Sequence, residues 1–552
     1  MGGKKILILG GSIRAVQSAL DMADAGNEVC LVEGLPEIDG LGLNLANGPE
    51  DTETSARSAW QAANNHKNIR IVRNAFIEKV KKENGRLHVQ IKKTAARVIE
   101  EKCNDCKACI KVCPIHLWDD AKAGLSLRTA IDSDNPEAGT YNILKERPVC
   151  EENCPVHLDI RGYIGLIADG KFKESLALIR EKLPFPATIG RICPHPCEEA
   201  CNRGREDKAL CIRDLKRFVA DYEGHEPPEA TIPIEQKNGK RVAIIGAGPA
   251  GLTCAHDLAK LGYGATVFEA LPVTGGMLAV GIPSYRLPRN ILEKEIDVVK
   301  RLGVEIRTNT RIGEDLSLEE LFNQGYEAVF IAVGAHKGQK IAIEGEDAKG
   351  VVPGVDFLRD LALGKEVQVE KRVAVIGGGN VAMDAARSSL RLGAEEVSIL
   401  YRRSREEMPA SDEEITAALD EGIKIEYLVA PLAVVTRNGK VVGIKCTRME
   451  LGDADASGRR RPIPIKGSEF EIVLDMVIPA IGQRSDLSLL SEKNRIEVTK
   501  WETIIVDSHT LSTNSARIFA GGDCVTGPGI AIEAVAAGKK AALSIDAYLK
   551  GK

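Results

Sequence analysis

The chain has 552 residues, which is enough for about three or four domains of about 150 residues each. Hydrophobic residues make up 44% and charged residues 28%, and the net charge of −5 gives no indication of a nucleic-acid partner. No apolar run reaches about 18 residues, so we expect no membrane span, and we expect a cytoplasmic location because polar residues interrupt any secretory signal.

The first predicted unit, residues 4–34, reads as a strand, a glycine turn, a helix and a second strand that ends at Glu33. Its turn, GGSIRA, departs from the dinucleotide pattern G-x-G-x-x-G, because Ser12 stands where the second glycine should be. Arg14 would attract phosphate, which leaves nucleotide binding open. We predict that residues 1–100 form a partial Rossmann-like α/β domain, without nucleotide.

Within that unit we expect a helix near residues 51–66 and strands at 68–72 and 86–93. Residues 120–145 show no periodic pattern and are expected to be irregular.

The chain has fourteen cysteines, and ten of them lie between Cys103 and Cys211. A disulfide scaffold would be unusual in a large intracellular chain, so metal or cluster binding is favoured. Residues 101–145 contain the spacing C-x2-C-x2-C-x3-C-P, which is typical of a bacterial 4Fe-4S cluster, whereas zinc sites use two separated C-x2-C pairs. The predicted ligands here are Cys103, Cys106, Cys109 and Cys113.

Residues 146–228 are expected to form a helical iron–sulfur domain, because apolar positions recur at helical spacing between two cysteine groups. The candidate ligands are Cys150, Cys154, Cys193, Cys197, Cys201 and Cys211. Ten cysteines fill two clusters with two left over, or three clusters with two ligands of another kind. Cys211 is either a ligand or a buried free thiol.

After a polar linker, RVAIIGAGPAGLTCAHDLAKLGYGATVFEA has an intact G-x-G-x-x-G between strand and helix, and Glu269 ends the next strand, where it can bind ribose hydroxyls. The later stretch TNSARIFAGGDC resembles the second flavin motif of the two-dinucleotide-binding-domain flavoproteins. We therefore predict an FAD domain split into residues 239–346 and 478–552. Its candidate FAD residues are Gly246, Gly248, Pro249, Ala250, Gly251, Glu269, Gly276, Met277, Gly522, Asp523, Ile530 and Ala531.

The inserted residues 347–477 contain a second fingerprint, G-x-G-x-x-A, followed by a strand that ends in arginines instead of an acid. Guanidinium groups there can accommodate a 2′-phosphate, which favours NADP(H); the alternative is a solvated basic loop. The candidate NADP residues are Gly377, Gly379, Asn380, Val381, Ala382, Arg402, Arg403 and Arg405. Hairpins are expected at 425–475, with turns at 438–439 and 457–458.

From about residue 146 onward the chain resembles the glutamate synthase small-subunit family and the N-terminal half of dihydropyrimidine dehydrogenase, on the stretches GGMLAVGIPSYRLPRNILEKEI, YRRSREEMPA and IPAIGQ. The resemblance implies hydride transfer between NADP(H) and FAD and one-electron transfer through 4Fe-4S clusters, with no catalytic side chain. It also implies that Cys154, Cys193 and Cys197 share one cluster while Cys150 and Cys201 serve another. The two cysteines expected shortly before Cys150 are absent.

Residues 1–145 resemble the start of the heterodisulfide reductase flavoprotein, in which a flavin-type fold precedes a ferredoxin-like cysteine run. They lack the second flavin motif, which favours a single FAD in the C-terminal domain. The predicted fold class is α/β, with two Rossmann-like domains preceded by a helical iron–sulfur domain and a partial α/β domain. We expect an electron-input or electron-output module of a larger redox complex, with NADPH and other subunits, iron–sulfur or flavin proteins, as partners. The alternatives are a structural conduit without nucleotide chemistry and a glutamate synthase small subunit.

Overall fold

The computed structural model divides into two compact units, residues 1–146 and 147–552, and each is described by itself. The residues that it describes are 4–9, 13–32, 62–63, 65–72, 75–83, 86–93, 116–118, 127–129, 131–135, 140–143, 148–222, 235–455, 458–490 and 495–551. The turn residue Ser12, the acid Glu33 and the four cysteines from Cys103 to Cys113 lie outside these ranges, as do residues 51–61 and 64 of the helix expected at 51–66.

The first unit begins with the predicted strand, helix and strand. Its parallel sheet has the order β1–β2–β3, and the helix α1 packs on it through Val16 and Ala19. The elements are β1 (Lys5–Leu9), α1 (Ile13–Asp24), β2 (Glu28–Val32) and β3 (Ile69–Val72), followed by the antiparallel pair β4 (Ala75–Glu83) and β5 (Arg86–Lys93).

Residues 120–145 are not irregular throughout, so that expectation was wrong. The pairs are β6 (His116–Trp118) with β7 (Leu127–Thr129), and β8 (Ile131–Asn135) with β9 (Thr140–Ile143). Strands of three to five residues contain too few alternations to produce a visible period, so the sequence pattern could not reveal them.

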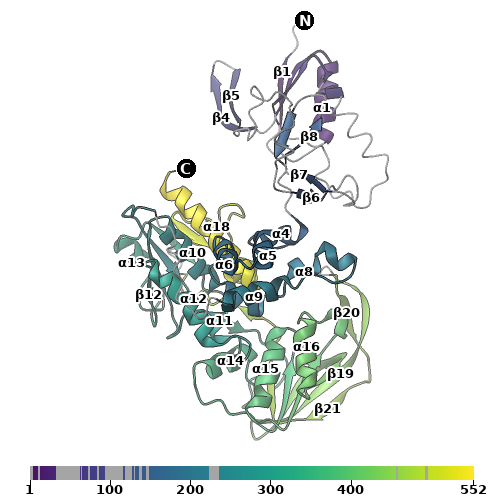
Figure 1. The fold of residues 1–552 in the computed structure, drawn as a ribbon. Coiled ribbons are helices and arrows are strands. Elements are labelled where there is room, and N and C mark those ends of the chain that lie inside the picture. Colours follow the sequence, from purple (N-terminus) through teal and green to yellow (C-terminus); the bar gives the residue numbers. More distant parts are fainter. Residues whose placement is uncertain are drawn as a thin grey trace. The chain divides into compact units, whose positions relative to one another are not determined.

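The second unit opens with short helices, as the apolar spacing predicted (Figure 1). Asp159 caps α5 by accepting a hydrogen bond from the Gly162 N–H at 2.8 Å. Pro186 begins α7, a position at which the missing N–H of proline costs nothing because the first backbone N–H groups of a helix have no partner within it. The helices are α4 (Val149–Glu152), α5 (Ile160–Ala168), α6 (Phe172–Arg180), α7 (Pro186–Ile192), α8 (Pro196–Glu199) and α9 (Ile212–Tyr222).

Two parallel sheets follow. The first has the order β12–β11–β10–β13–β24, and its last strand comes from the end of the chain, so the segments before and after the insertion form one sheet. Its elements are β10 (Arg241–Ile245), α10 (Pro249–Lys260), β11 (Gly264–Phe268), α11 (Met277–Val280), α12 (Arg289–Arg301), β12 (Glu305–Arg307), α13 (Leu318–Asn323), β13 (Ala328–Ile331), β24 (Ile518–Ala520), α17 (Asp523–Thr526) and α18 (Ala531–Leu549).

The insertion builds the second parallel sheet, of order β17–β16–β15–β22, and an antiparallel meander. The predicted turn at 438–439 is present, with positive φ at both residues. Its elements are α14 (Gly354–Ala362), β15 (Arg372–Ile376), α15 (Asn380–Arg391), β16 (Glu396–Tyr401), α16 (Asp412–Asp420), β17 (Lys424–Tyr427), β18 (Val429–Arg437), β19 (Lys440–Ala454), β20 (Arg460–Pro464), β21 (Phe470–Val473) and β22 (Met476–Pro479). The short pair β14 (Lys337–Gly338) and β23 (Gln483–Arg484) joins the two parts.

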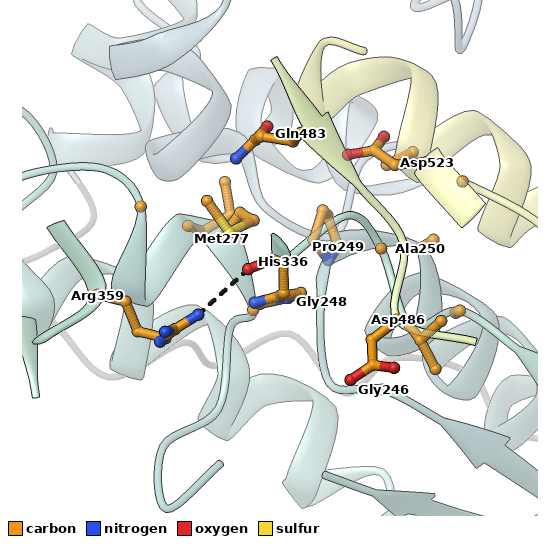
Figure 2. Close-up of a pocket in the computed structure, with 18 of the residues that line it drawn as sticks. Gly246, Gly248, Pro249, Ala250, Met277, His336, Arg359, Gln483, Asp486 and Asp523 are labelled. Atoms are coloured by element: carbon orange, nitrogen blue, oxygen red, sulfur yellow. Dashed lines mark hydrogen bonds between the residues drawn. The ribbon is translucent and has the colours of Figure 1, made fainter. Parts of the chain in front are cut away.

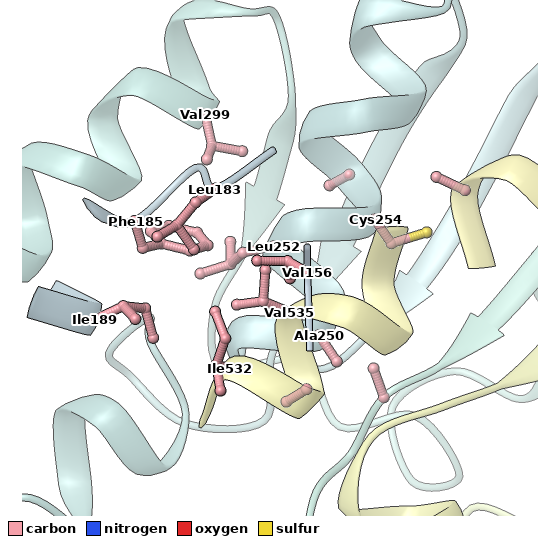
Figure 3. Close-up of a cluster of buried hydrophobic side chains, with 14 of the residues drawn as sticks. Val156, Leu183, Phe185, Ile189, Ala250, Leu252, Cys254, Val299, Ile532 and Val535 are labelled. Carbon is pink, nitrogen blue, oxygen red and sulfur yellow. The ribbon is translucent and has the colours of Figure 1, made fainter. Parts of the chain in front are cut away.

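The helical region and the first parallel sheet share one hydrophobic core. Figure 3 shows Leu183, Phe185 and Ile189 facing Leu252 of α10 and Val535 of α18. All five are fully buried. The helices around the cysteines are therefore held rigidly against the first sheet. Among the described helices, none is long and apolar enough to cross a membrane.

A buried carboxylate reinforces this contact. Glu295 on α12 accepts hydrogen bonds from the backbone N–H groups of Ala187, at 2.6 Å, and Thr188, at 2.9 Å, in the first turn of α7. The first N–H groups of a helix have no partner within the helix, so Glu295 supplies one from a different part of the fold. Burial raises the pKa of Glu295 to about 7, while these donors act to lower it.

We predict that Glu295→Ala lowers the free energy of unfolding by about 2–6 kcal/mol, because two buried N–H groups lose their acceptor at about 1–3 kcal/mol each. Glu295→Gln, which keeps one acceptor, should lose less. Chemical denaturation of the chain measures both. The exposed Glu293 on the same helix provides the control, and an equal effect of Glu293→Ala would contradict this assignment.

Candidate functional site

The first glycine turn connects β10 to α10 and cannot accept a side chain at its first position. Gly246 has φ +107°, and a Cβ there would lie 2.4 Å from the carbonyl oxygen of Ala332. A positive φ combined with such close backbone contact is compatible only with glycine. The turn therefore brings Gly246 directly against Ala332, the residue that follows β13.

The second glycine of this turn differs, because space is open beside it. Gly248 has an ordinary φ of −79°, and within 4 Å of a Cβ there would be only the Cα of Gly276, at 3.9 Å. Gly248 lines a cavity of about 820 Å³. No side chain therefore covers the backbone at Gly248, where α10 begins beside the cavity. A helix start that is open in this way can accept a pyrophosphate.

Nearly all residues predicted for FAD meet at this cavity, and Figure 2 shows Met277 and Asp523 beside it. Those that line it are Gly246, Gly248, Pro249, Ala250, Glu269, Gly276, Met277, Gly522, Asp523, Ile530 and Ala531. Gly251 does not line it. A Cβ at Gly251 would lie 2.0 Å from the Gly246 carbonyl oxygen, so this glycine serves the packing of the turn.

Two carboxyl groups in the cavity wall have altered pKa values. Glu269 is buried, which raises its pKa, and it accepts hydrogen bonds at 2.8 Å from the N–H groups of Ala247 and Leu271, which lower it. Burial also raises the pKa of Asp523 to about 6. Asp523 precedes α18, a helix of 19 residues whose first residue, Ala531, faces the same cavity, so a helix dipole points into it.

The cavity also has a set of polar residues that the sequence patterns did not predict. Arg359 donates a hydrogen bond to the carbonyl oxygen of His336 at 3.1 Å (Figure 2). Burial and two nearby arginines lower the pKa of His336 to about 4. The cationic residues in the wall are Arg286, Arg311, Lys337, Lys340, Arg359 and Arg484. Several follow β13 and β22, and the rule that ligands bind at the carboxyl ends of parallel strands could have indicated them.

The second glycine turn connects β15 to α15, but its glycines Gly377 and Gly379 do not line the cavity, and neither does the fully buried Ala382. Gly377 has φ +142°, with the Ala480 carbonyl oxygen 2.2 Å from where a Cβ would be, whereas a Cβ at Gly379 would meet nothing nearer than Pro409 Cγ at 3.8 Å. The adjoining residues Asn380 and Val381 line the cavity. The starts of α10 and α15 therefore lie at the same cavity.

The three arginines predicted for the 2′-phosphate differ in exposure and in the partners of their guanidinium groups. Arg403 is buried, and its guanidinium donates to Asp455 and to the carbonyl oxygen of Arg460, both at 2.8 Å. It therefore ties β16 to the meander. Arg405 pairs with exposed Asp412 at 3.0 Å. Arg402 is exposed and has no ion pair among the described residues.

The described cysteines fall into separate groups. Cys154, Cys193 and Cys197 are buried and line one small cavity together with Lys216 and Tyr163. Thiolate sulfur is the usual ligand of an iron–sulfur cluster, so this donor set fits one. Burial raises the pKa of Cys197 to about 12, and the nearby Lys216 acts to lower it. No group of three or more His, Cys, Asp or Glu in the described ranges is arranged to hold a single metal ion.

The other three cysteines are less enclosed. Cys150 and Cys201 are half-buried and close enough for Cys201 to act electrostatically on the pKa of Cys150. Cys211 is exposed and does not line the small cavity, so the alternative of a buried thiol there is wrong.

The two cavities are separated by very little protein. Ile192 and Pro194 line the large cavity, while Cys193 between them lines the small one. On α18, Ala531 lines the large cavity and its neighbour Ile532 lines the small one. Adjacent residues of two segments thus form a wall with the thiols on one side and the first glycine turn on the other.

Comparison with known proteins assigns both regions. Residues 240–538 match the family described as pyridine nucleotide-disulphide oxidoreductase, and residues 143–227 match the 4Fe-4S domain II of dihydropyrimidine dehydrogenase. The described cysteines within the first match, Cys254, Cys446 and Cys524, are all free.

Two relatives are similar to this chain over about three quarters of its length. The chain is 51% identical over 443 residues to the NADP(+)-dependent formate dehydrogenase subunit beta of Moorella thermoacetica, covering 75% of this chain and 62% of that one. It is 37% identical to the glutamate synthase [NADPH] small chain of Escherichia coli, covering 73% and 89%. The chain thus spans less than two thirds of the first relative.

A solved structure has the same fold. FprA from Mycobacterium tuberculosis matches with a TM-score of 0.50 at 21% identity, covering 56% of this chain and 85% of that one. The cofactors that these assignments give are FAD, NADP(H) and 4Fe-4S. The chain belongs to the pyridine nucleotide-disulphide oxidoreductase family.

Proposed function

We propose that the chain transfers electrons between NADP(H), FAD and 4Fe-4S clusters as the input or output module of a larger redox complex. The observation that carries this proposal is the shared geometry: the first glycine turn and the start of α15 line one cavity of about 820 Å³, and one thin wall separates that cavity from three buried thiols. Bound FAD would supply the conversion between hydride transfer and single-electron transfer.

The side chains and backbone have positioning roles in this proposal, and none acts as an acid or base. The starts of α10 and α18 bind phosphate and flavin through N–H groups and helix dipoles, and Glu269 accepts from ribose. The apolar wall around Ile192 and Ile532 keeps water from the path between the cavities. Residues 239–346 and 478–552 form the FAD domain, and residues 347–477 form the NADP(H) domain.

Residue by residue, the FAD site includes Gly246, Gly248, Asp523 and the other predicted positions around the first turn. The NADP(H) site includes Gly377, Gly379, Asn380, Val381 and Ala382. For the 2′-phosphate the proposal now relies on Arg402, with Arg405 as a second donor, because the guanidinium of Arg403 already has two partners.

For the clusters, the proposal keeps Cys154, Cys193 and Cys197 as ligands of one 4Fe-4S cluster, since these three thiols are buried at one cavity. Cys150 and Cys201 serve a second cluster, with Cys211 as a further candidate. Residues 101–145 hold another through the ferredoxin-like cysteines, and residues 1–100 form a platform without flavin. The domain limits, including 146–228 for the helical iron–sulfur domain, belong to the same proposal.

The named relatives are subunits, which supports a partner subunit for this chain too. The first is the beta subunit of a formate dehydrogenase that depends on NADP(+), so a partner that is itself an oxidoreductase fits the module role. We place the complex in the cytoplasm. The second candidate function is a glutamate synthase small subunit, favoured by the match over 89% of that relative. A conduit without nucleotide chemistry does not account for a cavity that is lined both by the first glycine turn and by the start of α15.

We predict that NADPH, added anaerobically to the purified chain, bleaches the flavin absorbance much faster than NADH does. Replacing Arg402 with Ala should lower kcat/KM for NADPH about 10- to 100-fold with little change for NADH, because a charged hydrogen bond contributes about 1.5–3 kcal/mol. The exposed Arg437 gives the matched control, Arg437→Ala. No bleaching with either nucleotide would refute the function, and equal rates would refute the arginine assignment.

We predict that two Gly→Ala variants separate the two nucleotide sites. Gly248→Ala should fold normally, because no atom lies nearer than 3.9 Å to the added Cβ, but should be isolated with little flavin, because the methyl group occupies the phosphate position. Gly379→Ala should retain flavin and lose NADPH-dependent bleaching. Circular dichroism and the flavin-to-protein ratio are the measurements. Full flavin content in Gly248→Ala would exclude the first turn as the pyrophosphate site, and a wild-type ratio clearly above one would show a second flavin.

A further inference from the structure

Lys216 has an unusual position for a lysine. It lies on α9 with Ile212, Val219 and Ala220, which are the buried positions of that helix, and only 5% of its surface is exposed. A buried helix face with this spacing normally has apolar residues throughout. The lysine therefore interrupts the apolar face at its centre.

The Lys216 ammonium has no carboxylate partner. Within the described part of the chain, no hydrogen bond or ion pair involves this side chain. A carboxyl group of the cysteine region, Glu198, accepts instead from the Arg213 N–H at 2.6 Å and lies 3.6 Å from His195. An ammonium that is largely removed from water and has no carboxylate partner is destabilised, so a nearby negative charge would stabilise it.

The groups that Lys216 does face are the three buried thiols. Lys216 lines the same small cavity as Cys154, Cys193 and Cys197, and its charge acts on Cys193 and Cys197 in the direction that favours thiolate. Because thiolates bound to iron retain excess negative charge, a cluster held by these three residues would supply the missing anion.

We propose that Lys216 is the buried counter-ion of the cluster held by Cys154, Cys193 and Cys197, and that its positive charge raises the reduction potential of that cluster. This inference rests on the proposed function. Adding one electron to the cluster adds one negative charge with no bond made or broken, and a fixed cation at the cavity wall stabilises the reduced form more than the oxidised form. Lys216 is thus a positioning residue that makes this cluster a better electron acceptor.

The test is a redox titration followed by electron paramagnetic resonance on the full chain. Lys216→Met keeps the length and volume of the side chain and removes the charge, whereas Lys216→Arg keeps the charge. We expect one component of the titration to shift to lower potential in Lys216→Met and to stay near its original midpoint in Lys216→Arg. Arg217→Met removes a charge from the exposed face of the same helix and should shift nothing.

The remaining outcomes are also decisive. An unchanged midpoint in Lys216→Met, with iron content retained, would overturn the inference and leave the proposed function intact. Altered g-values in both variants would identify Lys216 as an iron ligand and would equally overturn the counter-ion role. Loss of the cluster in Lys216→Met but not in Lys216→Arg would support the inference that the cluster needs the positive charge. Loss of the cluster in both Lys216→Met and Lys216→Arg would contradict it. Wild-type chain without iron or reducible clusters would instead refute the proposed function.

Discussion

The thin wall between the two cavities is the constraint on which the rest of the structure depends. Electron transfer through protein needs donor and acceptor close together, while a flavin and an iron–sulfur cluster need very different surroundings. Here adjacent residues keep the two sites close together and yet separate. Cys193 lines the small cavity, and its neighbours Ile192 and Pro194 line the large one. The shared hydrophobic core and the bonds from Glu295 to α7 hold this wall in place.

The order of the chain follows from the same requirement. The strand β24 joins the first sheet after the insertion. The helix α18 follows it, and the first residues of α18 line both cavities. The insertion brings the start of α15 to the same large cavity. The first glycine turn and the start of α15, about 130 residues apart in the sequence, thus line one cavity, as two dinucleotide-binding units side by side require.

The glycine turns, the split sheet and the three central cysteines could be predicted, because each depends on local spacing or on a motif that extends over a few residues. The cationic residues after β13 and the counter-ion candidate Lys216 could not, because their environment arises only when distant segments pack. Arg403 shows the opposite case: its motif predicts a phosphate donor, but a tertiary contact with Asp455 uses the guanidinium. A signal for Lys216 did exist, as a charged residue within an apolar helix face.

The stoichiometry of reoxidation tests the central claim most directly. The chain is fully reduced by a chemical reductant, freed of excess reductant, and mixed anaerobically with a large excess of NADP+, and the NADPH formed per FAD is measured by its near-ultraviolet absorbance. A flavin that is isolated from the clusters can yield about one NADPH per FAD, since one hydride carries two electrons. The thin wall predicts more than one, because the clusters discharge through the flavin. A yield of one, with the clusters still reduced by electron paramagnetic resonance, would contradict the account.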